Sequence, residues 1–263
     1  MPDAKAVGRR PLAGRRVVVT RARAQGASLI SLLKTSGANV LHTPVIEIAP
    51  PASWDSLDHV IDTSYDWLVF TSVNGVQAFF ARSHTSGLSL RAAHVAAVGS
   101  VTADALREHG VTPDVVPERF VLDELIPLLP DDQRGVRTAV IRAEEGREDL
   151  IAALRDRGGV VDLAIAYRTI GVPYDLAALR SAPIDAVTFT SPSTVEHFFG
   201  PLAGTDRNTL TSHAAFISIG PSTTEALRRF VDDRVFEAET ATMQGLHDAV
   251  VQALTHPALS SRA

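Results

Sequence analysis

Short apolar runs followed by amphipathic segments recur along the chain. Residues 17–20 and 139–141 are rich in β-branched side chains and have polar neighbours, a pattern typical of buried parallel strands. After each run, apolar residues return at helical spacing, so the pattern predicts a helix. Gly37 and Gly158 come directly after these helices. We expect both glycines in the left-handed conformation that ends a helix.

The chain contains an internal repeat. Residues 66–80 (DWLVFTSVNGVQAFF) and 185–199 (DAVTFTSPSTVEHFF) agree at seven of fifteen positions. Two further pairs of segments have about the same separation of 120 residues, 97–107 with 218–228 and 17–33 with 138–154. Each copy alternates strands with helices, which predicts an α/β fold with two parallel-sheet domains of the Rossmann or flavodoxin type.

Polar residues follow the predicted strands in both copies. In parallel α/β sheets, ligands bind beyond the carboxyl ends of the strands, so these residues are candidates for a binding site. The helices that start there have free N–H groups, which bind anions. None of the turns has a dinucleotide fingerprint or a P-loop, which makes nucleotide phosphates less favoured ligands. The candidates are Arg21, Arg142, Thr71, Ser72, Thr190, Ser191 and the segments 99–102 and 220–223.

The hydroxyl candidates have a simpler interpretation as helix caps. Ser72 and Ser191 are good N-cap residues, and Pro192 suits the first helical position. The spacing of Ser193 and Glu196 predicts a capping box. Capping alone and capping combined with ligand contact both remain open for the two serines.

The helix-start threonines have the same two interpretations. Thr102 and Thr223 occupy matching positions in the two copies, and each could cap its helix or also contact a ligand. The spacing of Ser222 and Glu225 predicts a second capping box, so we expect Ser222 to be structural.

The arginines and Tyr167 also have structural alternatives. A charged residue rarely follows a buried strand without a partner, so Arg21 and Arg142 could bind a ligand or pair with a nearby carboxylate. Tyr167 ends an apolar run where the second copy continues along the chain. It could act on a ligand or pack at a domain junction.

Composition narrows the classes of function. The net charge of −5 argues against nucleic acid as the main partner. Without cysteine, the chain has no disulfide and no thiolate nucleophile or metal ligand, and its histidines show no metal-binding spacing. The first 12 residues lack the apolar core of an export signal, and no stretch is apolar enough to span a bilayer. We therefore expect a cytoplasmic protein without a membrane partner.

Eight short motifs follow one another in the order typical of one enzyme family. Through them the chain resembles the uroporphyrinogen-III synthases from about Gly14 to about Ala253. Ala22 replaces a frequent proline, and Phe230-Val231 replaces a usual glycine, but both departures look structural. The motifs are Val19-Thr20-Arg21, 70–76 (FTSVNGV), 98–103 (VGSVTA), 142–148 (RAEEGRE), 166–169 (AYRT), 189–193 (FTSPS), 219–223 (IGPST) and 242–246 (TMQGL).

The resemblance implies that the domains differ from the sequence repeats. It predicts a discontinuous first domain, 1–46 with 169–263, and a second domain, 47–168. The chain would cross between them at about 45–48 and 166–172, where the two segments pair as a two-stranded hinge. Pro50-Pro51 and Pro173 suit extended linkers beyond the crossings. The ligand is expected between the two halves.

The resemblance also implies a reaction. The family cyclises hydroxymethylbilane, a linear tetrapyrrole with eight carboxylates, and inverts its last ring, without a metal or a cofactor. Tyr167 could assist departure of the substrate hydroxyl. Substrate carboxylates could be held by Arg21, Ser72, Thr102, Arg142, Arg147, Ser191 and Thr223.

Two alternatives to a monomeric enzyme remain open. One is a two-lobed binding protein, which would normally carry an export signal. The other is a non-catalytic, tetrapyrrole-binding sensor domain of the same fold. The nine residues 255–263 are too few for an added DNA-binding domain, which favours the enzyme.

Overall fold

The apolar runs form the strands of two five-stranded sheets. The computed structural model describes residues 10–86, 90–117, 122–146 and 148–255. The chain divides into two compact units, which we call unit 1 (Met1–Glu47 with Ile170–Ala263) and unit 2 (Ile48–Thr169). The strand runs predicted at 17–20 and 139–141 are confirmed as β1 (Arg16–Val19) and β6 (Arg137–Ala143).

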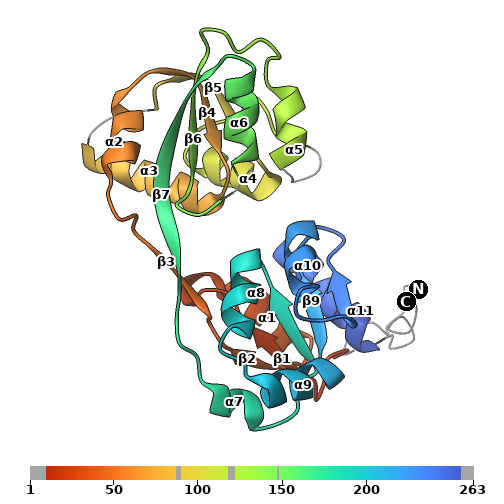
Figure 1. Ribbon diagram of the computed structural model, residues 1–263. Helices are drawn as coiled ribbons and strands as arrows, with labels where there is room; N and C mark the ends of the chain where they lie inside the picture. The colour runs from red at the N-terminus through yellow and green to blue at the C-terminus, as the bar shows by residue number, and fades with distance from the viewer. Residues whose placement is uncertain (1–9, 87–89, 118–121, 147, 256–263) are drawn as a thin grey trace, which may run out of the picture. The chain divides into compact units, whose positions relative to one another are not determined.

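Unit 1 contains a parallel sheet with the strand order β2-β1-β8-β9-β10, the flavodoxin-type order 2-1-3-4-5 when counted within the unit (Figure 1). Its helices cover both faces. Val17 and Val19 pack with α1 (Ala27–Thr35) and α11 (Met243–Thr255) on one face. Val18 packs with α7 (Leu176–Arg180), α8 (Pro192–Phe199) and α10 (Pro221–Leu227) on the other. The other elements are β2 (Asn39–His42), β8 (Ala186–Phe189), β9 (Ala215–Ser218), β10 (Val235–Glu237), the 3-10 helix η1 (Arg23–Gln25) and α9 (Gly204–His213).

Unit 2 contains a sheet with the order β3-β7-β6-β4-β5, in which β7, β6, β4 and β5 pair in parallel. Leu68 and Phe70 pack with α2 (Asp55–Asp62), α3 (Val73–Ser86) and α4 (Ser100–Glu108). Val69 and Val140 pack with α6 (Asp149–Asp156) and α5 (Leu122–Leu125). The remaining elements are β3 (Ile46–Ala49), β4 (Tyr65–Phe70), β5 (Ala92–Ala97), β7 (Val160–Gly171) and the 3-10 helix η2 (Ile126–Leu128).

Each sheet combines strands from both copies of the repeat. In unit 1, β1 of the first copy pairs with β8 of the second copy. In unit 2, β4 of the first copy pairs with β6 of the second. The chain therefore passes between the units twice, in β3 and in β7, which are hydrogen-bonded neighbours. This agrees with the predicted class of two parallel-sheet domains joined by a two-stranded hinge.

Helix ends match the sequence patterns only in part. Gly37 and Gly158 have φ angles of +93° and +90°, which confirms the predicted left-handed stops. Pro192 is the first residue of α8, as expected. Among the described residues, no helix is long and apolar enough to cross a bilayer.

Both predicted capping boxes are wrong. Ser191 caps α8, which confirms it as an N-cap, but its box partner is Thr194, and Ser193 with Glu196 forms no box. Helix α10 begins after Gly220, which has no side chain to offer as a cap. Ser222 therefore lies inside the first turn, where its hydroxyl is not the cap.

Candidate functional site

In unit 2, three predicted site residues come from adjacent strands. Ser72 follows β4, Arg142 belongs to the end of β6, and Tyr167 lies in β7. Since β6 pairs in parallel with both β4 and β7, these residues lie at the same edge of one sheet. The register between β6 and β7 shifts after Arg142, and Tyr167 is the residue paired across the shift.

A direct hydrogen bond joins two of these residues. The Ser72 Oγ and Tyr167 Oη atoms are 3.0 Å apart, and either hydroxyl can be the donor. Ser72 Oγ also accepts the backbone N–H of Gly75, at 3.2 Å. Tyr167 is half-buried and its ring packs against the core cluster of unit 2. Packing and hydrogen bonding thus coexist at Tyr167, so its two interpretations are compatible.

Arg142 is held by its own loop. Its side chain is almost fully buried and forms an ion pair with the carboxylate of Glu148. A Cβ at Gly146 would lie only 2.7 Å from Arg142 Nη1, so a glycine there gives the guanidinium room. The alternative to ligand binding, an ion pair with a nearby carboxylate, therefore accounts for most of the contacts of Arg142. Arg147, also a predicted site residue, lies outside the described residues.

The two candidate threonines occupy equivalent helix positions. Thr102 lies in the first turn of α4 after the N-cap Gly99, and Thr223 lies in the first turn of α10 after the N-cap Gly220. Both side chains are buried. Neither threonine is the N-cap residue, so simple capping does not account for them. Val101, next to Thr102 in the predicted segment 99–102, is 49% exposed.

In unit 1, Arg21 follows β1 and differs from Arg142 in its partners. Its Nη1 donates to the Met243 sulfur at 2.9 Å and not to a carboxylate, while its buried Nε, like that of Arg142, has no hydrogen bond among the described residues. Burial lowers the pKa of Arg21, and no carboxylate in the described part of the chain offsets that effect. A desolvated guanidinium without a counter-ion would bind an anion favourably.

Two contacts around Arg21 were not predicted. Met243 is the first residue of α11 and lies about 220 residues further along the chain than Arg21. It belongs to the family motif 242–246, but it was not predicted as a site residue. His42 Nε2 hydrogen bonds the Arg21 carbonyl at 3.0 Å. Gly26 makes room for this imidazole, because a Cβ there would lie 2.8 Å from His42 Nε2. No local pattern links these residues, so the sequence carries little signal for them.

Ser191 resembles Ser72 in position but not in partners. Its Oγ accepts the N–H of Thr194 at 3.2 Å and lies 2.9 Å from Ser193 Oγ. Both bonds are local to the start of α8. Ser191 is therefore first of all a helix cap, and a ligand role would be additional.

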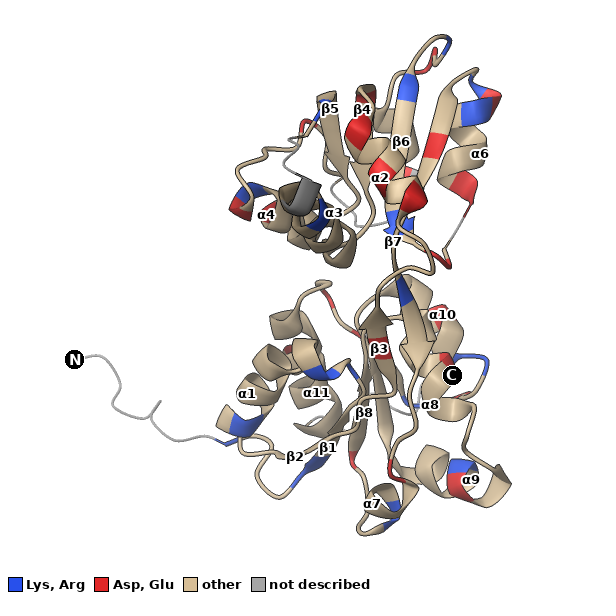
Figure 2. Ribbon diagram, turned by 90° about the vertical axis from the view of Figure 1, so that its left-hand side faces the viewer, with Lys and Arg blue, Asp and Glu red and all other residues tan. Residues whose placement is uncertain are grey.

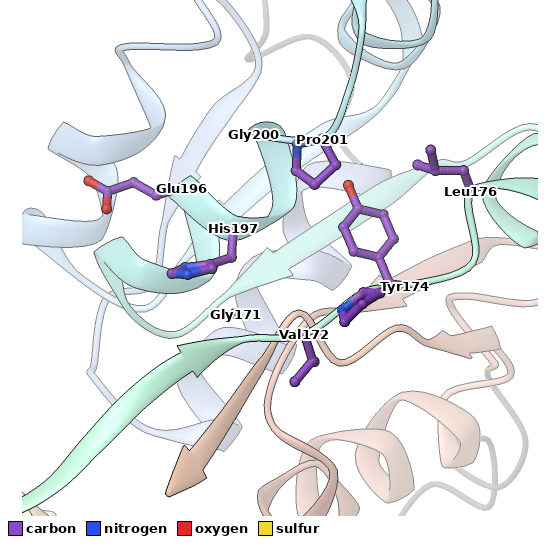
Figure 3. Close-up of a pocket in the computed structure, with 9 residues that line it drawn as sticks. Gly171, Val172, Tyr174, Leu176, Glu196, His197, Gly200 and Pro201 are labelled. Carbon is purple, nitrogen blue, oxygen red and sulfur yellow. The ribbon is translucent and has the colours of Figure 1, made fainter. Parts of the chain in front are cut away.

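Unit 1 also has a pocket that contains none of the predicted site residues. It has a volume of about 610 Å³ and lies between the segment after β7 and the second half of α8 (Figure 3). Burial raises the pKa of Tyr174 in its wall to about 12, and the charge of Asp206 adds to the effect. The His197 imidazole packs directly on Gly171, where a Cβ would come within 2.0 Å of the ring. The walls are mainly apolar, and we assign the pocket no role. It is lined by Gly171, Val172, Pro173, Tyr174, Leu176, Glu196, His197, Gly200 and Pro201.

Charge and metal-binding groups are spread out. Figure 2 shows Arg and Lys positions mixed with Asp and Glu positions on the elements of each unit. Within the described ranges, no group of three or more His, Asp or Glu side chains could hold a metal ion. The candidate residues at the strand ends offer hydroxyls, guanidinium groups and helix N–H groups.

Comparison with known proteins points to one family. The profile described as "Uroporphyrinogen-III synthase HemD" matches residues 27–248. A uroporphyrinogen-III synthase from Synechococcus elongatus is 34% identical, with 92% of this chain and 96% of that protein aligned. The porphyrin biosynthesis protein HemD of Ruminiclostridium josui is 28% identical over 93% of this chain, which spans about half (49%) of that longer protein.

A solved structure has the same fold. Uroporphyrinogen III synthase from Thermus thermophilus, in a mutant crystal form, superposes with a TM-score of 0.68. The match covers 91% of this chain and 98% of that one at 24% identity. At this identity the superposition supports the fold alone.

Proposed function

Because the chain belongs to the uroporphyrinogen-III synthase family, we propose that it converts hydroxymethylbilane to uroporphyrinogen III. The observation that carries this proposal is the match of the family profile over residues 27–248, which includes all the candidate residues except Arg21. The protein is accordingly a cyclising lyase of tetrapyrrole biosynthesis. No observation favours the non-catalytic sensor.

The proposed reaction begins at the hydroxymethyl group. The hydroxyl takes up a proton and leaves as water. The lone pair of the pyrrole nitrogen stabilises the positive charge left on the carbon, which gives an azafulvene cation. The last ring then attacks this carbon through its own substituted α-carbon and forms a spiro intermediate. Fragmentation and reclosure turn that ring over, and loss of a proton restores its aromaticity. The proton taken up first is thereby returned.

The chain's main task in this reaction is to control geometry. Without control, the cation closes head to tail and gives isomer I. The protein can hold the linear substrate in the conformation that brings the substituted carbon to the cation. This restriction of the substrate is an entropic contribution to catalysis. Eight substrate carboxylates give the protein many points at which to impose that conformation.

In unit 2, we assign the departure of the hydroxyl to Tyr167. A phenol donates one hydrogen bond to the leaving oxygen and need not ionise. Support comes from its position at the sheet edge that also carries Ser72, with which it shares a hydrogen bond. Thr102, Arg142, Arg147 and the start of α3 at Ser72 are proposed contacts for substrate carboxylates.

In unit 1, we assign carboxylate binding to Arg21, Ser191 and Thr223. Arg21 has the strongest support, because its guanidinium lacks an acidic partner among the described residues. The starts of α8 and α10 add backbone N–H groups at the same edge of the sheet.

We propose that the domains are 1–46 with 169–263 and 47–168. The two compact units support this division, because their boundaries fall within one residue of it. We also propose a cytoplasmic monomer that needs no cofactor and has neither nucleic acid nor membrane as a partner.

The test uses hydroxymethylbilane made enzymatically and supplied to the purified protein without added metal or cofactor. Separation of the products by chromatography should give mainly isomer III. Isomer I alone, formed at the uncatalysed rate, would reject the enzyme and favour the sensor. Analytical ultracentrifugation of the same sample tests the monomer.

A further inference from the structure

The Tyr167 hydroxyl lies at the end of a hydrogen-bond chain that starts in helix α3. Gly75, in the first turn of that helix, donates its N–H to Ser72 Oγ at 3.2 Å. Ser72 Oγ lies 3.0 Å from Tyr167 Oη. First-turn N–H groups carry the positive end of the helix dipole, so the chain links that dipole to the phenol.

The two hydroxyls have two protons and share one hydrogen bond, so one proton remains to point elsewhere. When Ser72 is the donor, three bonds run in the same direction, from the Gly75 N–H to Ser72, from Ser72 to Tyr167, and from Tyr167 outward. Hydrogen bonds in such a series polarise one another, and the last donor becomes stronger. When Tyr167 is the donor, its proton is used internally and cannot assist a ligand.

We propose that Ser72 is a positioning residue that donates its hydroxyl proton to the Tyr167 oxygen and so presents the phenol proton to the departing substrate hydroxyl. This role rests on the proposed function. It differs from holding a carboxylate, because the Ser72 side chain acts here through Tyr167. As the carbon–oxygen bond breaks, its electron pair leaves with the oxygen, and the phenol stabilises that oxygen by a hydrogen bond. The oxygen takes up a proton from solvent and departs as water, so the phenol keeps its own proton.

The backbone holds both partners in place. The Tyr167 carbonyl accepts the Glu144 N–H at 2.8 Å, beside the register shift between β6 and β7. Thr71, before Ser72, is bonded to the Ile141 carbonyl through its own N–H and Oγ1, each at 3.2 Å. The neighbours of the serine and the phenol are therefore bonded to β6 and to the residue that follows it, which places the two hydroxyls beside each other.

The matched serine of the other copy lacks this arrangement. Ser191 accepts a first-turn N–H in the same way, but its second partner is the neighbouring Ser193 hydroxyl. The contact with a phenol is thus a property of Ser72 and not of every serine that caps a helix at this position.

Kinetics test the proposal first. Ser72→Ala should lower kcat for isomer III about tenfold, the size expected for one hydrogen bond, with less change in KM. Ser72→Thr keeps the hydroxyl and should restore the rate. Ser72→Ala combined with Tyr167→Phe should be no slower than Tyr167→Phe alone, because the serine acts only through the phenol. If the two losses multiply in full, the proposal is rejected.

Loss of the cap itself needs a control. Ser72→Gly removes the hydroxyl but is a tolerable N-cap, so it should fold and show the same fall in kcat as Ser72→Ala. Asp175 caps α7 through the N–H groups of Ala177 and Ala178. Asp175→Ala loses a cap elsewhere and should keep the wild-type kcat. A fall in kcat with Asp175→Ala as large as with Ser72→Gly would reject a specific role for Ser72.

Infrared spectroscopy gives a readout that needs no substrate. The tyrosine C–O stretching band responds to whether the phenol oxygen accepts a hydrogen bond, and Tyr167 is one of only three tyrosines. Subtracting the Tyr167→Phe spectrum isolates its band. Ser72→Ala should shift this band, Ser72→Thr should restore it, and Ser191→Ala should leave it unchanged.

The two measurements separate the two proposals. In one outcome, the wild-type protein makes isomer III, but Ser72→Ala leaves the Tyr167 band unchanged. The proposed function would then stand, and the inferred hydrogen bond would be rejected. A band that shifts in a protein that makes no isomer III supports the bond and rejects the proposed function, and with it the inferred role.

Discussion

The two units have equivalent strand ends, yet the side chains there have different partners. In unit 2, Arg142 is buried against Glu148, and Ser72 contacts a phenol. In unit 1, Arg21 has a sulfur as its side-chain partner, and the Ser191 hydroxyl bonds to Thr194 and Ser193 at the start of its own helix. The repeat has preserved where the backbone places these residues. The surrounding side chains decide what each residue can do.

The difference between the arginines can be traced to the residues that follow them. Arg142 is followed by a loop with three glutamates, Glu144, Glu145 and Glu148, and one of them reaches back to it. Arg21 is followed by Ala-Arg-Ala-Gln-Gly, which contains no acid. A cation with a partner in its own loop is stabilised before any ligand arrives. Arg21 has no acidic partner among the residues that the structure describes, which makes it the better candidate for a ligand.

The strongest test of this comparison uses one tyrosine from each unit. Tyr167→Phe should lower the rate of isomer III formation about 10²-fold, the lower range for lost acid assistance, and raise the share of isomer I. Tyr174→Phe in unit 1 removes a hydroxyl that donates to the Phe198 carbonyl and should keep the rate, with about 1 kcal/mol less stability. A Tyr167→Phe protein with the wild-type rate and a lower melting temperature would make Tyr167 structural.

Glycines at the helix starts should differ between the units in stability. A Cβ at Gly245 in α11 would lie 2.2 Å from the Thr240 carbonyl oxygen, so backbone must move. Gly245→Ala should cost about 2–3 kcal/mol, as overpacking does. A Cβ at Gly75 in α3 would meet its nearest atoms at 3.4 Å, so Gly75→Ala should be neutral or slightly stabilising. Thermal unfolding of both variants checks this order, and equal melting temperatures would contradict it.

The two strand-end arginines should separate binding from stability. Arg21→Gln should raise KM about tenfold, since one charge-assisted hydrogen bond to a carboxylate is lost, and leave the melting temperature nearly unchanged. Arg142→Gln should instead reduce stability by about 1–2 kcal/mol, because a buried pair with an exposed glutamate is broken. Steady-state kinetics and unfolding curves on both variants give the comparison. If Arg142→Gln raises KM more than Arg21→Gln, the choice of Arg21 as the stronger contact for a substrate carboxylate is wrong.

Low pH should reduce the stability of both units slightly and by similar amounts. In unit 2, hydrogen bonds from Arg82 lower the pKa of Asp58, and in unit 1 those from Arg180 lower the pKa of Asp206. A folded pKa below the unfolded one gives stability that is present above the ordinary carboxyl pKa of about 4 and is lost as the pH falls through the folded value. Asp58→Asn or Asp206→Asn should lower Tm by about 2 °C or less at pH 7 and by less still at pH 3. A larger deficit at pH 3 than at pH 7 would reverse the sign and reject this account.

Local patterns predicted individual elements well and their exact ends less well. The strands β1 and β6 and the stops at Gly37 and Gly158 follow from β-branched runs and from the tolerance of glycine for positive φ. The capping box was placed at Ser193, two residues after the real cap, Ser191. The Ser-x-x-Glu spacing holds for Ser193 with Glu196 but not for Ser191, which has Thr194 at the matching position. The spacing rule therefore favoured the wrong serine for the box, whereas Pro192 at the first helical position indicated Ser191 as the cap.

By itself, the sequence determined the α/β class, the duplication and the family, because these depend on periodicity and on ordered short motifs that can be read along the chain. Only the tertiary structure decided which copies share a sheet and which side chains meet. Ser72 and Tyr167 are 95 residues apart, and their contact requires β4, β6 and β7 to lie side by side in that order. Hydrophobic periodicity tells each strand which faces to bury but not which strand to pair with. That choice depends on how all the strands pack around one core.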